Sequence, residues 1–437
     1  MSNQPQIQLP PVNFTAAGET DDLREANLQM AQQIPGYADA TLLIADAIGK
    51  RVEQVLMDYT RDGVVMKYQI DGMWHELPRR DRQSGDAMLA SMKCLGNMDA
   101  RERRAKQNGT FKVQFMHVKG PCTLTTQGVQ TGERAILDLT CNRVKLDRLK
   151  DLGMREKMRE RIGELFDADK GLIIITAMPK GGLTTTWTAC LNETDRFMRD
   201  FATVQSTTYS DPDVLNVAPN LYDPGKGETF AKAVRTLLLR EPEVLVLPEL
   251  KDEEAARIAV EQATDGERLV VTRIHSKGAD EALLRMLMLK PPTDKFAKAV
   301  HCVIASRLVR RLCETCRQPY KPAPQMLQKL GIPVGRVEAF YKPYQPPPTP
   351  PVDEKGNPIP QPICPQCQGL GFVGRMAIFE VLVVNDQIRK ALATKPKLDV
   401  LRRIVKETGH NTLQEEGILL VCQGVTSLTE LQRALTQ

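Results

Sequence analysis

Four cysteines form two closely spaced pairs, and this spacing is typical of metal-binding sites. Cys313 and Cys316 form one C-x-x-C pair, and Cys364 and Cys367 form the second. Each pair can place two thiolates on one tetrahedral ion through a tight turn, so the two pairs together predict a zinc site. Four thiolates leave no open coordination position, which makes this zinc structural. The alternative is four reduced structural cysteines or a redox pair.

A second stretch, GLIIITAMPKGGLTTT from Gly171 to Thr186, has the layout of a phosphate-binding loop. An apolar run leads into a glycine loop and then into helix-compatible spacing. The pattern G-x-x-x-x-G-K-[ST] is broken, because Ala177 and Leu183 stand where the first Gly and the Lys belong. The candidate nucleotide-binding residues of this degenerate loop are Lys180, Gly181, Gly182, Thr184 and Thr185.

The remaining chemistry of this loop is limited. Leu183 cannot bring a positive charge to the phosphates, but the Thr184 hydroxyl could bind Mg²⁺ and Lys180 could swing inward. The alternative is a loop that only joins a strand to a helix. Binding of ATP and Mg²⁺ is therefore an open question at this point.

Two candidate catalytic residues end apolar strands. Glu249 ends EVLVLPE and could act through Mg²⁺ or a water, and His275 ends LVVTRIH and could sense a γ-phosphate. A surface Glu and a structural His are the alternatives. Ligands of parallel sheets bind at the carboxyl ends of the strands, where Lys180, Gln205, Glu249 and His275 would gather.

The elements that must position these residues alternate between strand and helix. Such alternation predicts a parallel sheet with helices on both faces. We expect strands over 172–176, 201–206, 243–249 and 269–275, and helices over 184–191, 229–240, 252–264 and 279–289.

The flanking segments have other patterns. Residues 36–145 mix helical stretches with short β-rich runs and predict an α+β domain, whereas residues 1–35 are Gln- and Pro-rich and predict a flexible tail. A Pro-rich insert separates the two cysteine pairs. Residues 386–437 are predicted to be helical, with Thr412 and Ser427 as N-caps that each have a Glu three residues on.

Composition narrows the class of protein. The chain of 437 residues has room for about three domains. It contains no apolar run near the ~20 residues of a membrane span and no signal peptide, so we expect a cytoplasmic protein. The net charge of +5 is small for this length, which makes nucleic-acid binding a less favoured function.

These pieces together resemble the secretion ATPase superfamily, specifically the type II secretion and type IV pilus assembly ATPases. KYQIDGMWHELP and NMDARERRAKQNG resemble the N-terminal PAS-like domain of that family. The stretch from Gly227 to Ser276 resembles its Walker B and His-box region, and CPQCQGLGFVGRMAIFEVL resembles its zinc module. The resemblance covers about residues 36–437.

The resemblance implies an α/β fold with four parts after the tail. They are a PAS-like α+β domain (36–145), a RecA-like P-loop core (146–300), a tetracysteine zinc module with the Pro-rich insert (301–385) and a C-terminal helical region (386–437). It also implies a hexameric ring that drives pilus or pseudopilus assembly by ATP hydrolysis. Such a ring docks on cytoplasmic domains of inner-membrane platform proteins and is thus peripheral to the inner membrane.

The departures from the family pattern fall on its nucleotide site. Its P-loop Lys aligns with Leu183, its acidic pair with Gln205 and Ser206, and its nucleotide-facing arginines with Gln69 and Thr110. Losing a phosphate-facing Lys or a stabilising Arg costs orders of magnitude in rate. Pro248 and Lys251 are further departures beside Glu249, whereas Gly182, Thr184, Glu249, Asp252, His275 and the four cysteines are retained.

Three functions compete on these observations. We favour a pseudo-ATPase that serves as a scaffold or regulatory subunit, beside an active ATPase paralogue. The first alternative is a divergent but active ATPase, in which Lys180 or a neighbouring subunit supplies the missing charge. The second is a zinc-dependent binding module, including one for nucleic acid through the cluster Arg307–Arg311.

Overall fold

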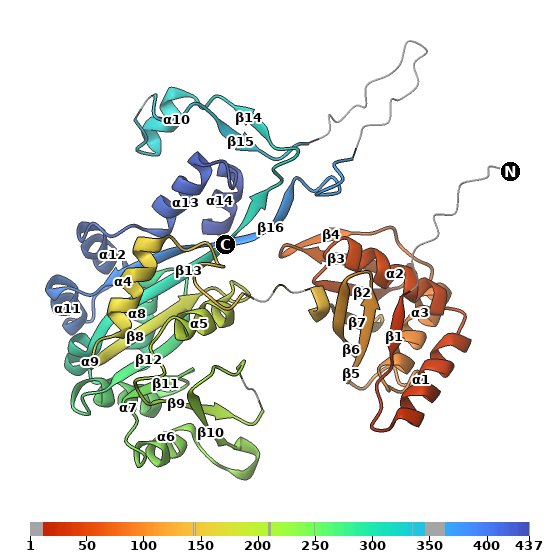
Figure 1. The fold of residues 1–437 in the computed structure, drawn as a ribbon, viewed down its shortest axis with the longest axis horizontal. Coiled ribbons are helices and arrows are strands. Elements are labelled where there is room, and N and C mark those ends of the chain that lie inside the picture. Colours follow the sequence, from red (N-terminus) through yellow and green to blue (C-terminus); the bar gives the residue numbers. More distant parts are fainter. Residues whose placement is uncertain are drawn as a thin grey trace. The chain divides into compact units, whose positions relative to one another are not determined.

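The computed structural model describes residues 12–142, 144, 146–208, 211–248, 250–333, 335–345 and 363–436. The chain forms two compact units, Met1–Lys145 and Leu146–Gln437. Each unit contains its own seven-stranded sheet, and Figure 1 labels the elements of both.

The first unit is built on an antiparallel sheet with the order β1-β5-β6-β7-β2-β3-β4. Side chains along β2 and β5 alternate in burial, as expected for a sheet with one face on a core. The strands are β1 (Asn13–Thr15), β2 (Gln54–Thr60), β3 (Gly63–Ile70), β4 (Met73–Glu76), β5 (Gln107–Phe115), β6 (Val118–Val129) and β7 (Gly132–Asp138). The helices are α1 (Asp21–Gln33), α2 (Tyr37–Gly49) and α3 (Arg82–Leu95), and a 3-10 turn, η1 (Thr140–Asn142), ends the unit.

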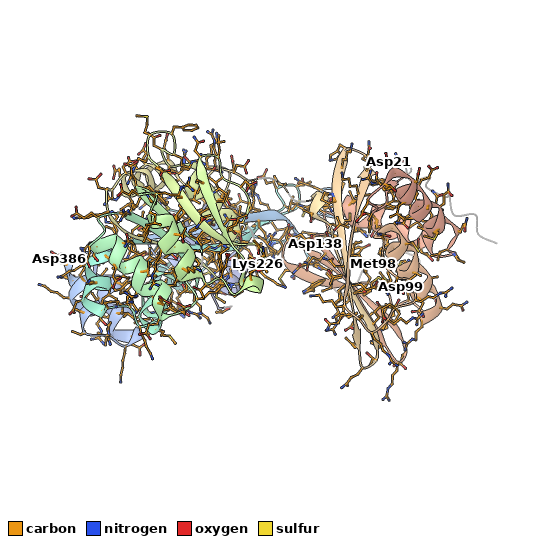
Figure 2. The ribbon with its side chains drawn as sticks, turned by 90° about the horizontal axis from the view of Figure 1, so that it is seen from below. Asp21, Met98, Asp99, Asp138, Lys226 and Asp386 are labelled. Carbon is orange, nitrogen blue, oxygen red and sulfur yellow. The ribbon has the colours of Figure 1, made fainter. Side chains whose placement is uncertain are left out.

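The expectation of a flexible tail over residues 1–35 is wrong for its described part, which holds β1 and α1. Thr20 caps α1 by accepting the Leu23 N–H at 3.3 Å, and the buried Asn27 donates to the Ala17 carbonyl at 2.8 Å. Asp21 lies in the first turn of this helix (Figure 2), where a carboxylate is favoured by the helix dipole. Residues 1–11 lie outside the described part of the chain.

The second unit contains the parallel sheet that the sequence predicts. Its order is β10-β9-β11-β12-β8-β13-β16, and only the β13–β16 pair is antiparallel. The strands are β8 (Gly171–Ala177), β9 (Phe201–Ser206), β10 (Val217–Tyr222), β11 (Val244–Leu247), β12 (Leu269–His275), β13 (Val300–Leu312) and β16 (Phe372–Val383). Burial on both faces explains why β8, β11 and most of β12 are continuous apolar runs.

Helices cover both faces of this sheet (Figure 1). One core lies between the sheet and α4 (Glu156–Phe166) and α5 (Leu183–Asn192). A larger core lies on the opposite face. Its helices are α6 (Phe230–Leu238), α7 (Glu253–Thr264), α8 (Ala279–Met288), α9 (Thr293–Ala299), α11 (Asp386–Ala393) and α12 (Leu398–Glu407). A short turn, η2 (Pro224–Lys226), precedes α6.

Strand β13 joins the parallel sheet to the cysteine-bearing segment. Its first half pairs with β8, it pairs with β16 from Cys302 to Leu312, and Cys313 follows its last residue. The expected boundary lies between the core (146–300) and the zinc module (301–385). In the structure this position lies at the start of β13, a strand that both regions share. Beside its distal half lie α10 (Pro324–Lys329), α13 (Leu413–Cys422), α14 (Leu428–Thr436) and the small sheet of β14 (Gln318–Tyr320) and β15 (Phe340–Lys342).

The two predicted N-caps of the C-terminal helices are present. Thr412 and Glu415 form a complete capping box, whereas Ser427 accepts the Glu430 N–H at 3.2 Å. The Glu430 carboxylate accepts hydrogen bonds from Arg310 of β13 and from Arg433 instead of closing a box. In the part of the chain that the structure describes, no helix has the length and apolarity that a membrane span requires.

Candidate functional site

The loop between β8 and α5 has the strand–loop–helix layout of a phosphate loop. β8 ends at the buried Ala177, and Gly182 precedes α5 with a φ of 85°. This left-handed conformation is accessible to glycine at little steric cost. Thr184 and Thr185 lie in the first turn of α5, where backbone N–H groups lack helical partners and favour an anion.

The turn before that helix directs its one basic side chain outward. Gly181 donates its N–H to the Met178 carbonyl at 2.8 Å, which closes a turn over Pro179 and Lys180. Lys180 has a φ of 59° and an exposed side chain. The Gly181 N–H is therefore used within the loop, and the lysine lies on the surface of the turn.

Leu183 belongs to the hydrophobic core and not to the surface of the loop. Its side chain is 7% exposed, and it lies in the core cluster that also contains Trp187, with Leu308 of β13 packed against that cluster. Thr186, one turn later, bonds to the buried Ser306 hydroxyl at 3.1 Å. The position where a P-loop has its lysine is thus occupied by an apolar group that stabilises the α5–β13 contact.

The carboxyl ends of β9 and β12 carry the other predicted site residues. Gln205 and Ser206, both neutral, end β9, and the Ser206 hydroxyl lies 2.7 Å from that of Thr208. His275 is exposed at the end of β12, and its Nδ1 lies 3.0 Å from the carbonyl oxygen of Ala177, so it borders the loop. Glu249, the predicted catalytic carboxylate, lies outside the described residues.

Arg273 on β12 is a residue of this edge that the sequence analysis did not single out. Its guanidinium lies 5.2 Å from the centroid of the Trp187 ring, donates to the Pro248 carbonyl at 2.8 Å and lies 2.9 Å from the Asp211 carboxylate. Both charged side chains are largely buried, at 11% and 3% exposure. The ion pair joins β12 to the loop after β9, beside the first half of α5.

A small cavity lies beside this ion pair. It has a volume of about 50 Å³ and is lined mainly by side chains from β9 and the loop after it, together with Arg273. Pockets that hold cofactor-sized ligands typically measure about 300–1,000 Å³. This cavity is therefore too small for a cofactor-sized ligand.

The two N-terminal positions where the family has arginines hold short polar groups. Gln69 is 9% exposed on β3, opposite Trp74 of β4. Thr110 is on β5, and its hydroxyl lies 3.0 Å from the Thr123 hydroxyl on β6. Neither position carries a positive charge, and the Thr110 hydroxyl is used within its own sheet.

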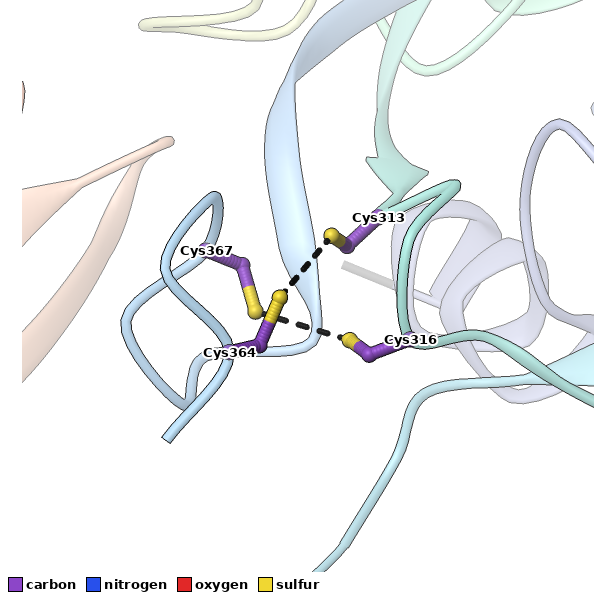
Figure 3. Close-up of side chains that lie close together, drawn as sticks. All are labelled: Cys313, Cys316, Cys364 and Cys367. Atoms are coloured by element: carbon purple, nitrogen blue, oxygen red, sulfur yellow. Dashed lines mark hydrogen bonds between the residues drawn. The ribbon is translucent and has the colours of Figure 1, made fainter. Parts of the chain in front are cut away.

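The four cysteines are brought together as their spacing predicts. The Sγ atoms of Cys313, Cys316, Cys364 and Cys367 all lie within 4.8 Å of one another. Figure 3 shows the side chains pointing toward a common centre, with Cys313 3.7 Å from Cys364 and Cys316 3.6 Å from Cys367. This arrangement fits a tetrahedral zinc ion with four thiolate ligands.

Backbone groups of the second cysteine turn support an anionic sulfur. The Cys367 and Gln366 N–H groups lower the pKa of the Cys364 thiol to about 7, although burial opposes them. The Gly371 N–H donates to the Cys367 sulfur at 3.2 Å. Donors aimed at thiolates are the outer-shell support that metal-binding cysteines require, so the donor set and its surroundings both fit zinc.

A helix-covered parallel sheet with a glycine loop between β8 and α5, together with a tetracysteine cluster, defines a RecA-like P-loop ATPase fold. The family model of Type II/IV secretion system protein matches residues 31–433. The chain therefore belongs to this family, which confirms the resemblance and the fold class that the sequence indicates.

Named relatives extend over most of the chain. Type IV pilus assembly ATPase PilB of Thermus thermophilus is 26% identical over 392 residues, which are 89% of this chain but 42% of that protein. Type II secretion system protein E of Aeromonas hydrophila is 27% identical over 97% of this chain and 80% of its own length. The HofB homolog of Escherichia coli, a protein transport protein, is 28% identical over 90% of this chain.

Solved structures share the fold at lower sequence identity. The ATPase DotB of Legionella pneumophila aligns with a TM-score of 0.57 and 12% identity, over 92% of this chain and 96% of that chain. The pilus retraction motor PilT, solved with ADP, aligns with a TM-score of 0.50 and 17% identity, over 90% of this chain and 95% of that chain.

Proposed function

We propose that this chain is a pseudo-ATPase that acts as a scaffold or regulatory subunit of a type II secretion or type IV pilus machine. The observation that carries the proposal is the burial of Leu183, at 7% exposure, where the phosphate-binding lysine belongs. A charged replacement for it is not supplied by Lys180, whose side chain is exposed on the turn. Without a cation at the β- and γ-phosphates, hydrolysis loses its main electrostatic support.

Two further features of the same edge support the proposal. Gln205 and Ser206 provide no carboxylate for Mg²⁺ or for an attacking water. The largely buried Arg273–Asp211 ion pair lies at this edge, beside a cavity of about 50 Å³. The first feature removes groups that would act on nucleotide, and the second is a buried contact that stabilises the fold.

The proposed role requires partners. The named relatives are proteins of secretion and pilus assembly, so we expect docking on cytoplasmic domains of inner-membrane platform proteins and a location at the inner face of that membrane. We also expect a homo- or hetero-oligomer, in which an active ATPase paralogue supplies the hydrolysis. Structural zinc would hold the cysteine segment in its docking-competent form.

Phosphate release by the purified full chain tests the proposal. With ATP and Mg²⁺, malachite-green detection should give no release above that of a Glu249→Gln variant, and a nucleotide titration should give weak or no binding. Release by the parent chain that Glu249→Gln abolishes would instead establish the divergent active ATPase. That alternative is favoured by the retained Thr184 and by His275, whose Nδ1 lies 3.0 Å from the loop carbonyl of Ala177.

A second measurement tests the scaffold role directly. Co-purification with the cytoplasmic domain of the platform protein, and with the active ATPase of the same machine, should occur without added nucleotide. Light scattering of each mixture would give its stoichiometry. Binding that depends on ATP hydrolysis by this chain would contradict a purely structural role.

A further inference from the structure

A large cavity that the proposed function does not use lies in the first unit, away from the phosphate loop in sequence. It has a volume of about 730 Å³, within the range of pockets that hold nucleotide-sized ligands. Three segments converge on it: the start of α3, the loop before β5 and the hairpin between β6 and β7. Its lining includes Arg82, Arg103, Arg104, Asp86, Tyr59 and Glu133.

The charges around this pocket do not cancel. Asp86 pairs with Arg103 at 3.1 Å, and the buried Glu133 pairs with the buried Lys93 at 2.6 Å. Among the described residues, no carboxylate lies within ion-pair distance of Arg82 or of the exposed Arg104. The pocket therefore presents two guanidinium groups whose positive charge its own acids leave uncompensated.

One of these guanidinium groups is held in place before any ligand arrives. Arg82 donates to the Thr60 carbonyl at 2.9 Å and to the Thr131 carbonyl at 3.4 Å, and its guanidinium lies 5.9 Å from the centre of the Tyr59 ring. Its partners are backbone oxygens of two turns, so its position is fixed while its charge is retained. A cation fixed in advance loses little side-chain entropy when it binds an anion.

The floor of the pocket is closed by a tyrosine ring. The Tyr59 side chain is 2% exposed, and its hydroxyl oxygen is buried, so the ring and not the hydroxyl faces the pocket's arginine. The guanidinium groups are therefore the donors that the pocket offers to an anion, and arginine forks match the oxygens of a phosphate group.

We propose that this pocket binds a small phosphorylated ligand, with Arg82 and Arg104 on the phosphate oxygens. Its volume exceeds what a single phosphate fills, so the preferred ligand carries a diphosphate or a phosphorylated organic group of up to nucleotide size. The pocket is independent of the proposed loss of hydrolysis, because it lies in the other unit and uses none of the residues of the phosphate loop.

Calorimetric titration of the full chain with pyrophosphate tests this assignment. Arg104→Glu should weaken binding by at least about tenfold, since it places an anion where the described residues hold a cation without an ion-pair partner. Arg101→Glu is the matched control: it makes the same charge change on the same loop, outside the pocket lining, and should alter binding less than about twofold. Gln130→Glu, at the exposed hairpin tip that lines the pocket, should weaken binding as well.

Two further arms separate the other outcomes. The Lys180→Ala variant, whose change lies in the second unit, should bind pyrophosphate as the parent chain does. If Lys180→Ala lost binding while Arg104→Glu kept it, the anion would bind at the phosphate loop, and the proposal would be overturned. If Arg101→Glu and Arg104→Glu weakened pyrophosphate binding equally, the binding would be due to general surface charge and the proposed site would be overturned. Arg104-dependent sedimentation with phosphatidylglycerol vesicles, without pyrophosphate binding, would assign the surface to lipid headgroups and also overturn it.

Discussion

The tetracysteine cluster, between β13 and β16, and the phosphate loop, after β8, adjoin strands of the same sheet but differ in the side chains that they direct inward. The cluster turns four identical ligands toward one point and supports them with backbone donors. The phosphate loop turns its only lysine outward and an apolar Leu183 inward. The cluster keeps a complete binding chemistry, and the loop keeps only the backbone path. A protein with a structural role needs the intact metal site, and it can function with a phosphate loop that has lost its catalytic groups.

Removing one cysteine should have the largest effect. Cys313→Ala leaves three thiolates for the metal, and loss of a structural metal site destabilises on the order of 4 kcal/mol or more. For a unit of this size the melting temperature should fall by roughly 10 °C. Metal analysis should show about one zinc in the parent chain and less in the variant. Cys422→Ala, outside the cluster, is the control and should retain the zinc.

Breaking the ion pairs of Glu430 should have the second-largest effect on stability. Glu430 is 1% exposed and accepts from Arg310 of β13, so Glu430→Gln should cost about 3 kcal/mol in the free energy of unfolding. Burial alone would raise the pKa of Glu430, but hydrogen bonds from Arg433 and Arg310 lower it below its usual range.

The sign of the pH dependence follows from that lowered pKa. The stabilisation by Glu430 is complete above the unfolded value of about 4.3 and is lost as the pH falls through the lower folded value. Urea unfolding of parent and Glu430→Gln between pH 3 and pH 7 should give stabilities that converge toward acid. A constant difference across this range would contradict the assignment.

Leu183→Ala tests whether the phosphate loop directs an apolar side chain into the core. A buried leucine should cost about 2–4 kcal/mol when truncated, whereas a loop residue that faces solvent or phosphate should cost less than about 1 kcal/mol. Chemical denaturation measures the difference. Thr185→Ala, partly exposed in the same helical turn, is the control and should change stability little.

The smallest effects should come from a pair of neighbouring backbone positions. Lys180 has a φ of 59° and Gly182 a φ of 85°. Lys180→Gly should therefore stabilise by about 1 kcal/mol and Gly182→Ala should destabilise by about the same amount. Opposite shifts in melting temperature would support the structural account of the loop, and a loss of stability in Lys180→Gly would show that the lysine side chain has a contact of its own.

Sequence patterns predicted the features that depend on local order. Apolar runs predicted β8, β11 and β12, and the C-x-x-C spacing predicted the cluster. The pair of Arg273 and Asp211 could not be predicted, because its members are far apart in sequence and a polar residue near a strand end is usually solvated. Helix α1 was missed since its stability depends on the Thr20 cap and on Asn27, and not on an apolar face.

Strand β13 links the two loops mechanically. Ser306 lies opposite Ala177 of β8, and Cys313 follows seven residues later, at about 23 Å along an extended strand. An extended strand transmits a pull along its axis with little stretch, so a shift of the cysteine end would be delivered to the Ser306 hydroxyl and to its 3.1 Å contact with Thr186. We therefore expect metal occupancy at one end to affect the stability of the first turns of α5 at the other.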